Sequence, residues 1–372
     1  MKKNGDTKIK YQFIYQELLH NINAGHFING QRLPTEVELV KQFKVSRPTV
    51  ARALRQLQKE GIVERRTKVG SYVRVQKRDS TARKMFGLLI PGLGDTEIFE
   101  LICGQMAALS KRNNFTLLWG GSMVHTKVSD GLVTEQVCHQ YIDQKVDGVF
   151  FAPCELMPDA YEVNYRIVRK LEKAKIPLVL IDRDIVTFPE RSSYDLVGID
   201  NYRSGYILAH HLLKIKREQV DFLAYPFSAE TVEMRILGYQ EALRRAGIQP
   251  DTDWVHTGDP DDLDFIRTLV DAKKIRAIIC ANDVTAAVLM HSLDEIGVKV
   301  PQGVRVVGHD DIKYAKHLRV PLTTLRQPCQ ELGIIAVHTM LKRLANPDLP
   351  PRNILLNGKL VVRKSCGHAL YS

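Results

Sequence analysis

The sequence predicts an α/β protein in two parts, a small N-terminal α+β module followed by a larger body with parallel sheets. Three observations support this prediction. Apolar residues recur at helical spacing in the first quarter of the chain, and continuous apolar runs alternate with helical stretches in the rest. The basic residues are concentrated in the first part. A length of 372 residues agrees with two or three domains.

The charge of the chain is unevenly distributed. Residues 1–84 contain 19 Lys and Arg against 7 Asp and Glu, a net charge of +12. Residues 85–372 contain 34 basic and 35 acidic residues, a net charge of −1. A solvated basic face is the ordinary alternative, but a compact basic module beside a neutral body is more typical of a phosphate-binding unit.

The first two elements of the module are predicted to be helices. Within residues 11–25, Ile14 and Ile22 belong to a set of apolar residues at helical spacing, and a glycine follows them. Thr35 precedes the second helix and Glu38 follows three residues later. This spacing predicts a capping box.

A third helix and a hairpin complete the module within residues 1–75. Ser46 is placed to cap the third helix, and Gly61 to end it. The next residues alternate between apolar and polar around a turn at 68–71, which predicts two strands. Helix, helix, turn, helix and two strands make a winged helix-turn-helix domain.

The start of the third helix carries side chains suited to DNA. In a helix-turn-helix this end enters the major groove, and its free N–H groups favour phosphate. Ser46 and Thr49 can donate to phosphate oxygens, and Arg47 can bind phosphate or guanine. A simple helix cap and a solvated arginine are the alternatives. The predicted DNA-binding residues are Ser46, Arg47, Thr49, Arg52 and, at the tip of the wing, Lys68 and Gly70.

The module resembles the DNA-binding domain of the gluconate-repressor (GntR) superfamily over about residues 8–75. The resemblance rests on the motifs "LPTE", "VSRPTV", "EG" and "RRTKVGSYV". It implies operator contacts at Ser46, Arg47, Thr49 and Gly70. One departure is Ala51, where many relatives carry arginine and this chain has arginine at the next position.

The remainder of the chain is predicted to form a two-lobed body. Residues 76–84 are polar and charged, which indicates a linker. Residues 85–372 alternate apolar strands with helices, and this pattern predicts parallel sheets covered on both faces. In such sheets ligands bind beyond the carboxyl ends of the strands.

Polar side chains follow several of these strands. Asp182 and Arg183 end one strand, Asn282 and Asp283 another, and Asp310 a third. Carboxylates accept hydrogen bonds and the forked donors of Arg and Asn supply them, which suits the neighbouring hydroxyl groups of a sugar. Each residue also has an ordinary alternative, such as a helix cap or a surface ion pair.

The body is similar to the sugar-binding part of the lactose-repressor (LacI) family and to periplasmic sugar-binding proteins. The motifs "IPLVLIDR", "RILGYQEAL", "CANDVTAAVL", "VVGHDD" and "PLTTLRQP" follow in the order seen there. The resemblance implies a two-lobed, periplasmic-binding-protein-like body. It also implies ligand contacts from Asp182, Arg183, Arg235, Asn282, Asp283, Asp310 and Gln327, with Asp95 and Phe99 in the variable first loop.

Two features depart from that family. His309 stands where an aromatic residue is usual. The family's own N-terminal DNA-binding helices and its hinge helix are absent, because the basic module takes their place. Signalling through a hinge helix in the minor groove is therefore not expected.

An enzyme is the alternative class, namely a carbohydrate-processing enzyme with an attached nucleic-acid-binding module. No GxGxxG, GxxxxGK[ST] or HExxH motif occurs, so we expect no cofactor and no metal. The six cysteines form no CxxC pair, which favours reduced thiols in the cytoplasm. No apolar stretch reaches the roughly 18 residues of a membrane helix.

The sequence therefore predicts a ligand-responsive transcriptional regulator, a repressor of sugar-utilisation genes that a monosaccharide releases. A pentose or a deoxyhexose fits the polarity of the expected cleft. The partner is double-stranded, pseudo-palindromic operator DNA, and a homodimer is expected because one module reads only a half-site. Closure of the lobes on the sugar would change the spacing of the two modules.

Overall fold

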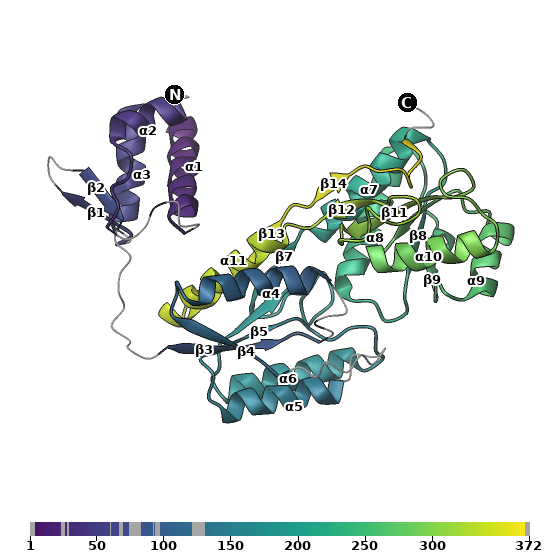
Figure 1. The fold of residues 1–372 in the computed structure, drawn as a ribbon, viewed down its shortest axis with the longest axis horizontal. Helices are drawn as coiled ribbons and strands as arrows, with labels where there is room; N and C mark the ends of the chain where they lie inside the picture. The colour runs from purple at the N-terminus through teal and green to yellow at the C-terminus, as the bar shows by residue number, and fades with distance from the viewer. Residues whose placement is uncertain are drawn as a thin grey trace. The chain divides into compact units, whose positions relative to one another are not determined.

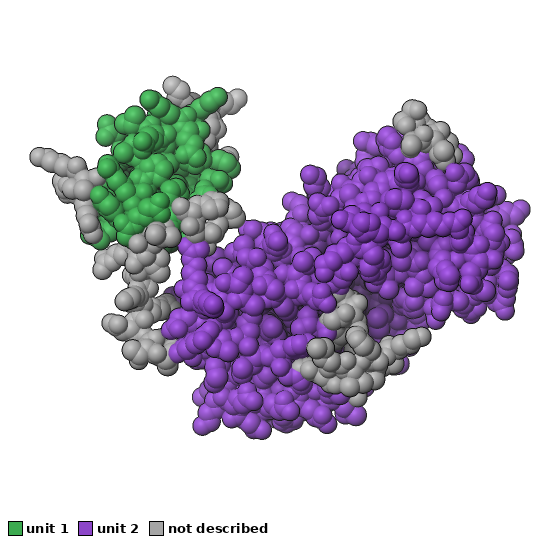
Figure 2. Space-filling view, viewed as in Figure 1, with its two compact units in different colours: residues 1–82 green, residues 83–372 purple. Residues whose placement is uncertain are grey.

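The computed structural model describes residues 4–23, 27, 30–59, 61–66, 70–73, 83–91, 93, 97–120 and 131–368. The chain divides into two compact units, residues 1–82 and 83–372 (Figure 2). Most of the predicted linker, residues 76–84, lies outside the described residues. Among the described helices, none is long and apolar enough to cross a membrane.

The N-terminal unit is a winged helix-turn-helix, as the sequence predicts. Its antiparallel hairpin pairs Val63 with Val73. The elements are α1 (Asn4–Asn23), α2 (Glu36–Phe43), α3 (Arg47–Lys59), β1 (Val63–Arg66) and β2 (Gly70–Val73). Fully buried side chains from all three helices, Ile14, Leu39 and Leu54 among them, form one core.

The predicted capping box is present at the start of α2. The Thr35 backbone N–H donates to the Glu38 carboxylate at 2.7 Å, and the Glu38 backbone N–H donates to Thr35 Oγ1 at 3.3 Å. The helix ends at Lys44, whose φ of 51° lies in the left-handed region. These two ends fix the short turn between α2 and α3.

The first lobe of the body is built on a parallel sheet of six strands in the order β13-β7-β6-β5-β3-β4. The strands are β3 (Lys84–Leu89), β4 (Phe115–Trp119), β5 (Gly148–Phe151), β6 (Leu178–Ile181), β7 (Asp195–Ile199) and β13 (Asn353–Leu356). One face is covered by α4 (Glu97–Ser110) and α11 (Cys329–Ala345), the other by α5 (Gly131–Asp143) and α6 (Ala160–Lys173) (Figure 1).

The second lobe has a six-stranded sheet in the order β14-β12-β11-β10-β8-β9. Its strands are β8 (Asp221–Ala224), β9 (Val255–Thr257), β10 (Ala277–Cys280), β11 (Arg305–Asp310), β12 (Thr323–Arg326) and β14 (Lys359–Val361). The edge strand β14 runs antiparallel to β12, and the other pairs are parallel. Helices α7 (Asn201–Ile215) and α8 (Glu230–Arg245) cover one face, and α9 (Leu263–Arg267) and α10 (Asp283–Glu295) the other.

The chain crosses between the lobes three times: from β7 to α7, from β12 to α11, and from β13 to β14. Helices α7 and α8 pack at backbone contact. A Cβ on Gly205 would lie 1.9 Å from the Arg235 carbonyl oxygen, and one on Gly238 would lie 1.8 Å from the Tyr202 carbonyl oxygen. Only glycine allows this approach, which brings the N-terminal part of α7 against the middle of α8.

Candidate functional sites

The start of α3 presents one long exposed side chain. The Arg47 side chain is 74% exposed. Ser46 precedes the helix, and its hydroxyl lies 2.8 Å from the Thr49 hydroxyl. Thr49 is only 4% exposed. The Thr49 hydroxyl is therefore engaged at the start of the helix, and the phosphate contact predicted for it stays a prediction.

Glu36 forms ion pairs with two arginines at the start of α3, the proposed recognition helix. Arg47 Nε lies 2.9 Å from Glu36 Oε2, and Arg65 Nη2 lies 2.5 Å from Glu36 Oε1. The hydrogen bond from Arg47 holds the pKa of Glu36 below its usual value. The sequence analysis did not single out Glu36 or Arg65. The acidic residue in the first turn of α2 and the basic hairpin at 65–66 could have suggested an ion pair between them.

The other predicted DNA-binding residues lie around this helix and the wing. The Arg52 guanidinium stands 4.2 Å from the centre of the Tyr11 ring, which directs it toward α1. Gly70 has a φ of 136°, and a Cβ there would lie 2.8 Å from Arg32 Nε. Glycine is therefore favoured by the backbone conformation, whereas the flexible end of the Arg32 side chain could move aside. Lys68 lies outside the described residues.

In the first lobe, Asp182 and Arg183 follow the carboxyl end of β6. Both are buried, and Asp182 has a φ of 71°. Arg183 forms an ion pair with Glu155, and its Nε lies 3.6 Å from Asp182 Oδ2. The guanidinium lies 5.7 Å from the centre of the Phe99 ring on α4. Burial raises the pKa of Asp182. Asp95 lies outside the described residues.

In the second lobe, Arg235 is held at the start of α8 beside the first crossing. Its Nε donates to Asn201 Oδ1 at 2.8 Å and its Nη1 to the Ala281 carbonyl oxygen at 2.6 Å. Asn201 begins α7, and Ala281 directly follows β10. Arg235 therefore reaches the carboxyl end of the sheet as predicted, with its donors partly used by the protein.

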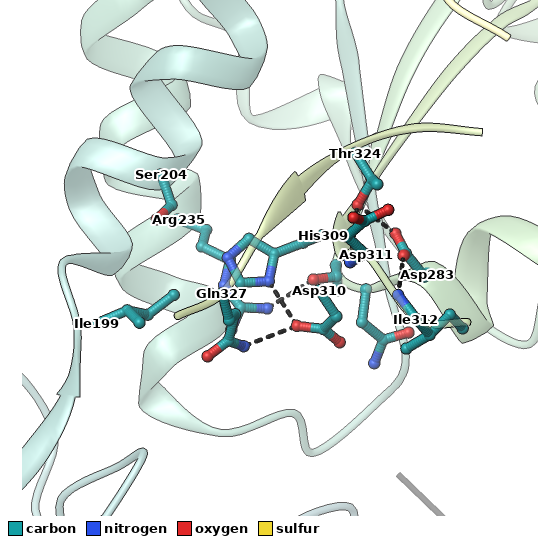
Figure 3. A network of polar contacts seen from close by, with 12 residues as sticks. Ile199, Ser204, Arg235, Asp283, His309, Asp310, Asp311, Ile312, Thr324 and Gln327 are labelled. Carbon is teal, nitrogen blue, oxygen red and sulfur yellow. Dashed lines mark hydrogen bonds and ion pairs between the residues drawn. The ribbon is translucent and has the colours of Figure 1, made fainter. Parts of the chain in front are cut away.

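Asp310 and Gln327 meet at the same edge of the sheet (Figure 3). Gln327 Nε2 donates to Asp310 Oδ1 at 2.7 Å, and His309 Nδ1 lies 2.8 Å from the same oxygen. Burial, with a contribution from the Arg235 guanidinium, lowers the pKa of His309 to about 4. The imidazole is therefore neutral at pH 7, and the proton that it donates to the carboxylate is on Nδ1.

Asn282 and Asp283 have partners within the protein. Asn282 Oδ1 caps α10, accepting from the Thr285 backbone N–H at 2.8 Å. Asp283 is fully buried; its Oδ1 accepts from Thr324 Oγ1 at 2.5 Å and its Oδ2 from the Ile312 backbone N–H at 3.1 Å (Figure 3). The Asp283 carboxyl group therefore holds the segment after β11, and the direct ligand contact predicted for it stays a prediction.

The two lobes contact each other through hydrogen bonds among the described residues. The Leu156 backbone N–H donates to the Phe227 carbonyl oxygen at 2.8 Å. The Asp184 backbone N–H donates to Glu230 Oε1 at 3.1 Å. In a third bond the donor is in the second lobe: the Lys313 backbone N–H donates to Glu97 Oε2 at 2.5 Å. Each bond joins an element of the first lobe to one of the second, so the structure has the lobes engaged.

The described residues contain no group of three or more His, Cys, Asp and Glu side chains that could hold a metal ion. All six cysteines are buried free thiols. Burial raises the pKa of the Cys154 thiol to about 11, which makes it unreactive at neutral pH.

Comparison with known proteins gives a separate match for each unit. Residues 10–73 match the gntR family of bacterial regulatory proteins. Residues 209–366 match a periplasmic binding protein-like domain. The matches confirm the two resemblances stated from the motifs, and they imply DNA and a small effector as partners.

Two curated relatives span nearly the whole chain, and both are called arabinose metabolism transcriptional repressors. The protein of Halalkalibacterium halodurans is 27% identical and covers 97% of each chain. That of Geobacillus stearothermophilus is 24% identical and covers 96% of this chain and 98% of its own. Among solved structures, the regulator CelR with cellobiose has a TM-score of 0.66 at 23% identity, over 87% of this chain and 92% of its own.

These similarities favour a regulator over the alternative of a carbohydrate-processing enzyme, because the matched proteins are regulators. The fold agrees with them in both units. The protein is a ligand-responsive transcriptional regulator in which a gntR-type winged helix-turn-helix domain precedes a periplasmic-binding-protein-like effector domain.

Proposed function

We propose that this regulator represses genes of sugar utilisation and that a monosaccharide, with arabinose first among the candidates, releases it from DNA. The observation that carries the proposal is a set of polar side chains at the carboxyl ends of the two sheets: Asp182 and Arg183 follow β6 in the first lobe, and Asp310 ends β11 and Arg235 reaches the end of β10 in the second. Asp182 interacts electrostatically with Arg183, Arg235 and Asp310. The names of the two curated relatives support arabinose as the first sugar to test.

The polar groups of the cleft suit an uncharged sugar. Arg183 is balanced by Glu155 and lies close to Asp182. Asp310 adds a further carboxylate on the second lobe. Such a surface offers hydrogen bonds to hydroxyl groups in both directions, and its carboxylates offset the charge of the two arginines. We therefore place a neutral pentose before a sugar phosphate.

On the DNA side, Arg47 extends from the start of the recognition helix and carries the operator contact in our proposal. Ser46, Arg52 and the wing residues Lys68 and Gly70 supply further contacts to the backbone. A homodimer places two modules on a pseudo-palindromic operator, because two-fold DNA sites match two-fold proteins. A regulator of this kind acts in the cytoplasm.

The test combines calorimetry with a gel shift. The full chain is titrated with L-arabinose, other pentoses, deoxyhexoses and a pentose phosphate. Operator DNA, selected from random fragments by the wild-type chain, is then titrated with and without the sugar that binds. We expect a pentose to bind and to weaken DNA binding. Binding of the phosphate but of no neutral sugar would contradict the effector class, and unchanged DNA affinity would contradict release.

A further inference from the structure

Asp310 stands in an unusual backbone conformation at the end of β11. Its φ is 119°, and that of the next residue, Asp311, is 57°. Residues other than glycine rarely adopt such values, and they persist only where the surroundings fix them. Contacts around Asp310 must therefore hold it in this conformation.

Both hydrogen bonds to the Asp310 side chain end on one oxygen. Gln327 Nε2 lies 2.7 Å and His309 Nδ1 lies 2.8 Å from Oδ1. The Asp310 side chain is 13% exposed, whereas His309 is fully buried. Figure 3 shows the second carboxylate oxygen turned away from both donors. The two donors thus fix the carboxylate in one rotation and leave Oδ2 as the outward acceptor.

The second ring nitrogen of His309, Nε2, forms no hydrogen bond with Asp310. Nε2 is buried without a hydrogen-bond partner. A buried polar atom without a partner is unfavourable, and a hydrocarbon ring of the same shape would avoid that cost. A phenylalanine or tyrosine ring at this position would have no ring N–H to donate to Asp310. The Nδ1–H group is therefore what histidine adds in this chain.

We propose that His309 is a positioning residue for effector binding, whose Nδ1–H, together with Gln327, aims Asp310 Oδ2 at a hydroxyl group of the sugar. The proposal rests on the proposed function, since it assumes a hydroxylated effector in this cleft. The rival explanation is that His309 only fills the core. In that case an aromatic residue of similar size would serve equally well.

Two variants separate these explanations. His309→Phe keeps the ring volume and removes the donor. His309→Asn gives up volume but places an amide N–H close to the position of Nδ1. Isothermal calorimetry on the full chain measures L-arabinose and its monodeoxy derivatives against the wild type and both variants. Thermal unfolding and DNA binding of the same samples show whether the fold is retained.

We expect His309→Phe to bind L-arabinose roughly tenfold more weakly than the wild type, and His309→Asn to recover most of that loss. In the wild type, one monodeoxy derivative also binds roughly tenfold more weakly, because Asp310 loses its donor. In His309→Phe the sugar and that derivative should bind alike. Equal affinity of the wild type and His309→Phe, or an unchanged penalty for the derivative, would overturn the proposal.

A second measurement needs no effector. The ¹⁵N resonances of His309, assigned by their absence from His309→Asn, should show a neutral ring with its proton on Nδ1 at pH 7. A neutral ring with its proton on Nε2, which leaves Nδ1 without a hydrogen to donate, would overturn the proposal. If the wild type binds no pentose, the proposed effector is wrong. The ¹⁵N spectrum then decides by itself whether His309 holds Asp310.

Discussion

Glu36 binds Arg47 across the turn of the DNA-binding module, with Arg47 Nε 2.9 Å from Glu36 Oε2. The Glu36 side chain is 18% exposed and that of Arg47 is 74% exposed. The inner partner thus anchors one edge of a guanidinium whose remaining donors extend from the surface. The DNA contact proposed for Arg47 would therefore start from an arginine that is already oriented.

Replacing Arg47 should weaken operator binding. Arg47→Ala removes a charge-assisted contact at the start of the recognition helix, and the expected loss is about 1–3 kcal/mol. Effector affinity should stay unchanged, because the residue lies in the other unit. Gel-shift titration at fixed salt measures the loss, with Lys59→Ala at the far end of the same helix as the control. Equal operator affinity of Arg47→Ala and the wild type would remove Arg47 from the site.

The division of charge predicts a strong effect of salt. Residues 1–84 hold the whole net positive charge of the chain, so non-specific DNA affinity should fall steeply and linearly in log[salt]. A chain beginning at Met85 should lose DNA binding and keep its sugar. Fluorescence anisotropy with random duplex DNA tests both points. DNA binding by the shortened chain would place the site in the body.

Arg235 should matter for the effector and not for DNA. Arg235→Ala removes donors at the cleft and leaves the Ala281 carbonyl oxygen without one of its partners. We expect sugar affinity to fall by about 1.5–3 kcal/mol, roughly ten- to a hundredfold, with some loss of thermal stability. Arg244→Ala, at the exposed end of the same helix, is the control. Calorimetry with L-arabinose measures both variants, and equal binding by them would refute the assignment.

Asp283 should make stability depend on pH. Burial, the largest cause, and the nearby Asp310 raise its pKa well above the ordinary 3.8. Between these two values the folded state holds a proton that the unfolded state has lost, so this group makes stability fall as pH rises. Asp283→Asn removes that dependence. Thermal unfolding from pH 4 to pH 7 should therefore show a steeper decline for the wild type than for the variant. The same pH dependence of thermal unfolding in the wild type and in Asp283→Asn would contradict the raised pKa of Asp283.

The fold followed from local patterns, which is why it could be predicted. The capping box of Thr35 and Glu38 and the glycine at position 61, with a φ of 72°, depend on neighbours in sequence. Continuous apolar strands such as Gly148–Phe151 are buried along their whole length, so they indicate a covered parallel sheet.

The surroundings of the candidate site residues depend on tertiary packing. Thr49 carries a hydroxyl suited to phosphate, but its side chain is buried and its hydroxyl lies 2.8 Å from that of Ser46. Asp283 ends a strand just as Asp182 does, yet its partners Ile312 and Thr324 lie 29 and 41 residues away. A single sequence shows which side chains can form hydrogen bonds. It does not show which of them are already paired within the folded protein.

The three crossings between the lobes limit where the body can recombine with other proteins during evolution. Neither lobe is a continuous piece of chain, so a single recombination point within residues 201–326 would divide both cores. The DNA-binding module, in contrast, precedes Arg83 as one uninterrupted segment. A single join near this residue would exchange it for another module and yield a chimaera with the same effector and a new operator. Inheritance of the body as an indivisible cassette would explain how one sensor architecture comes to follow unrelated DNA-binding modules.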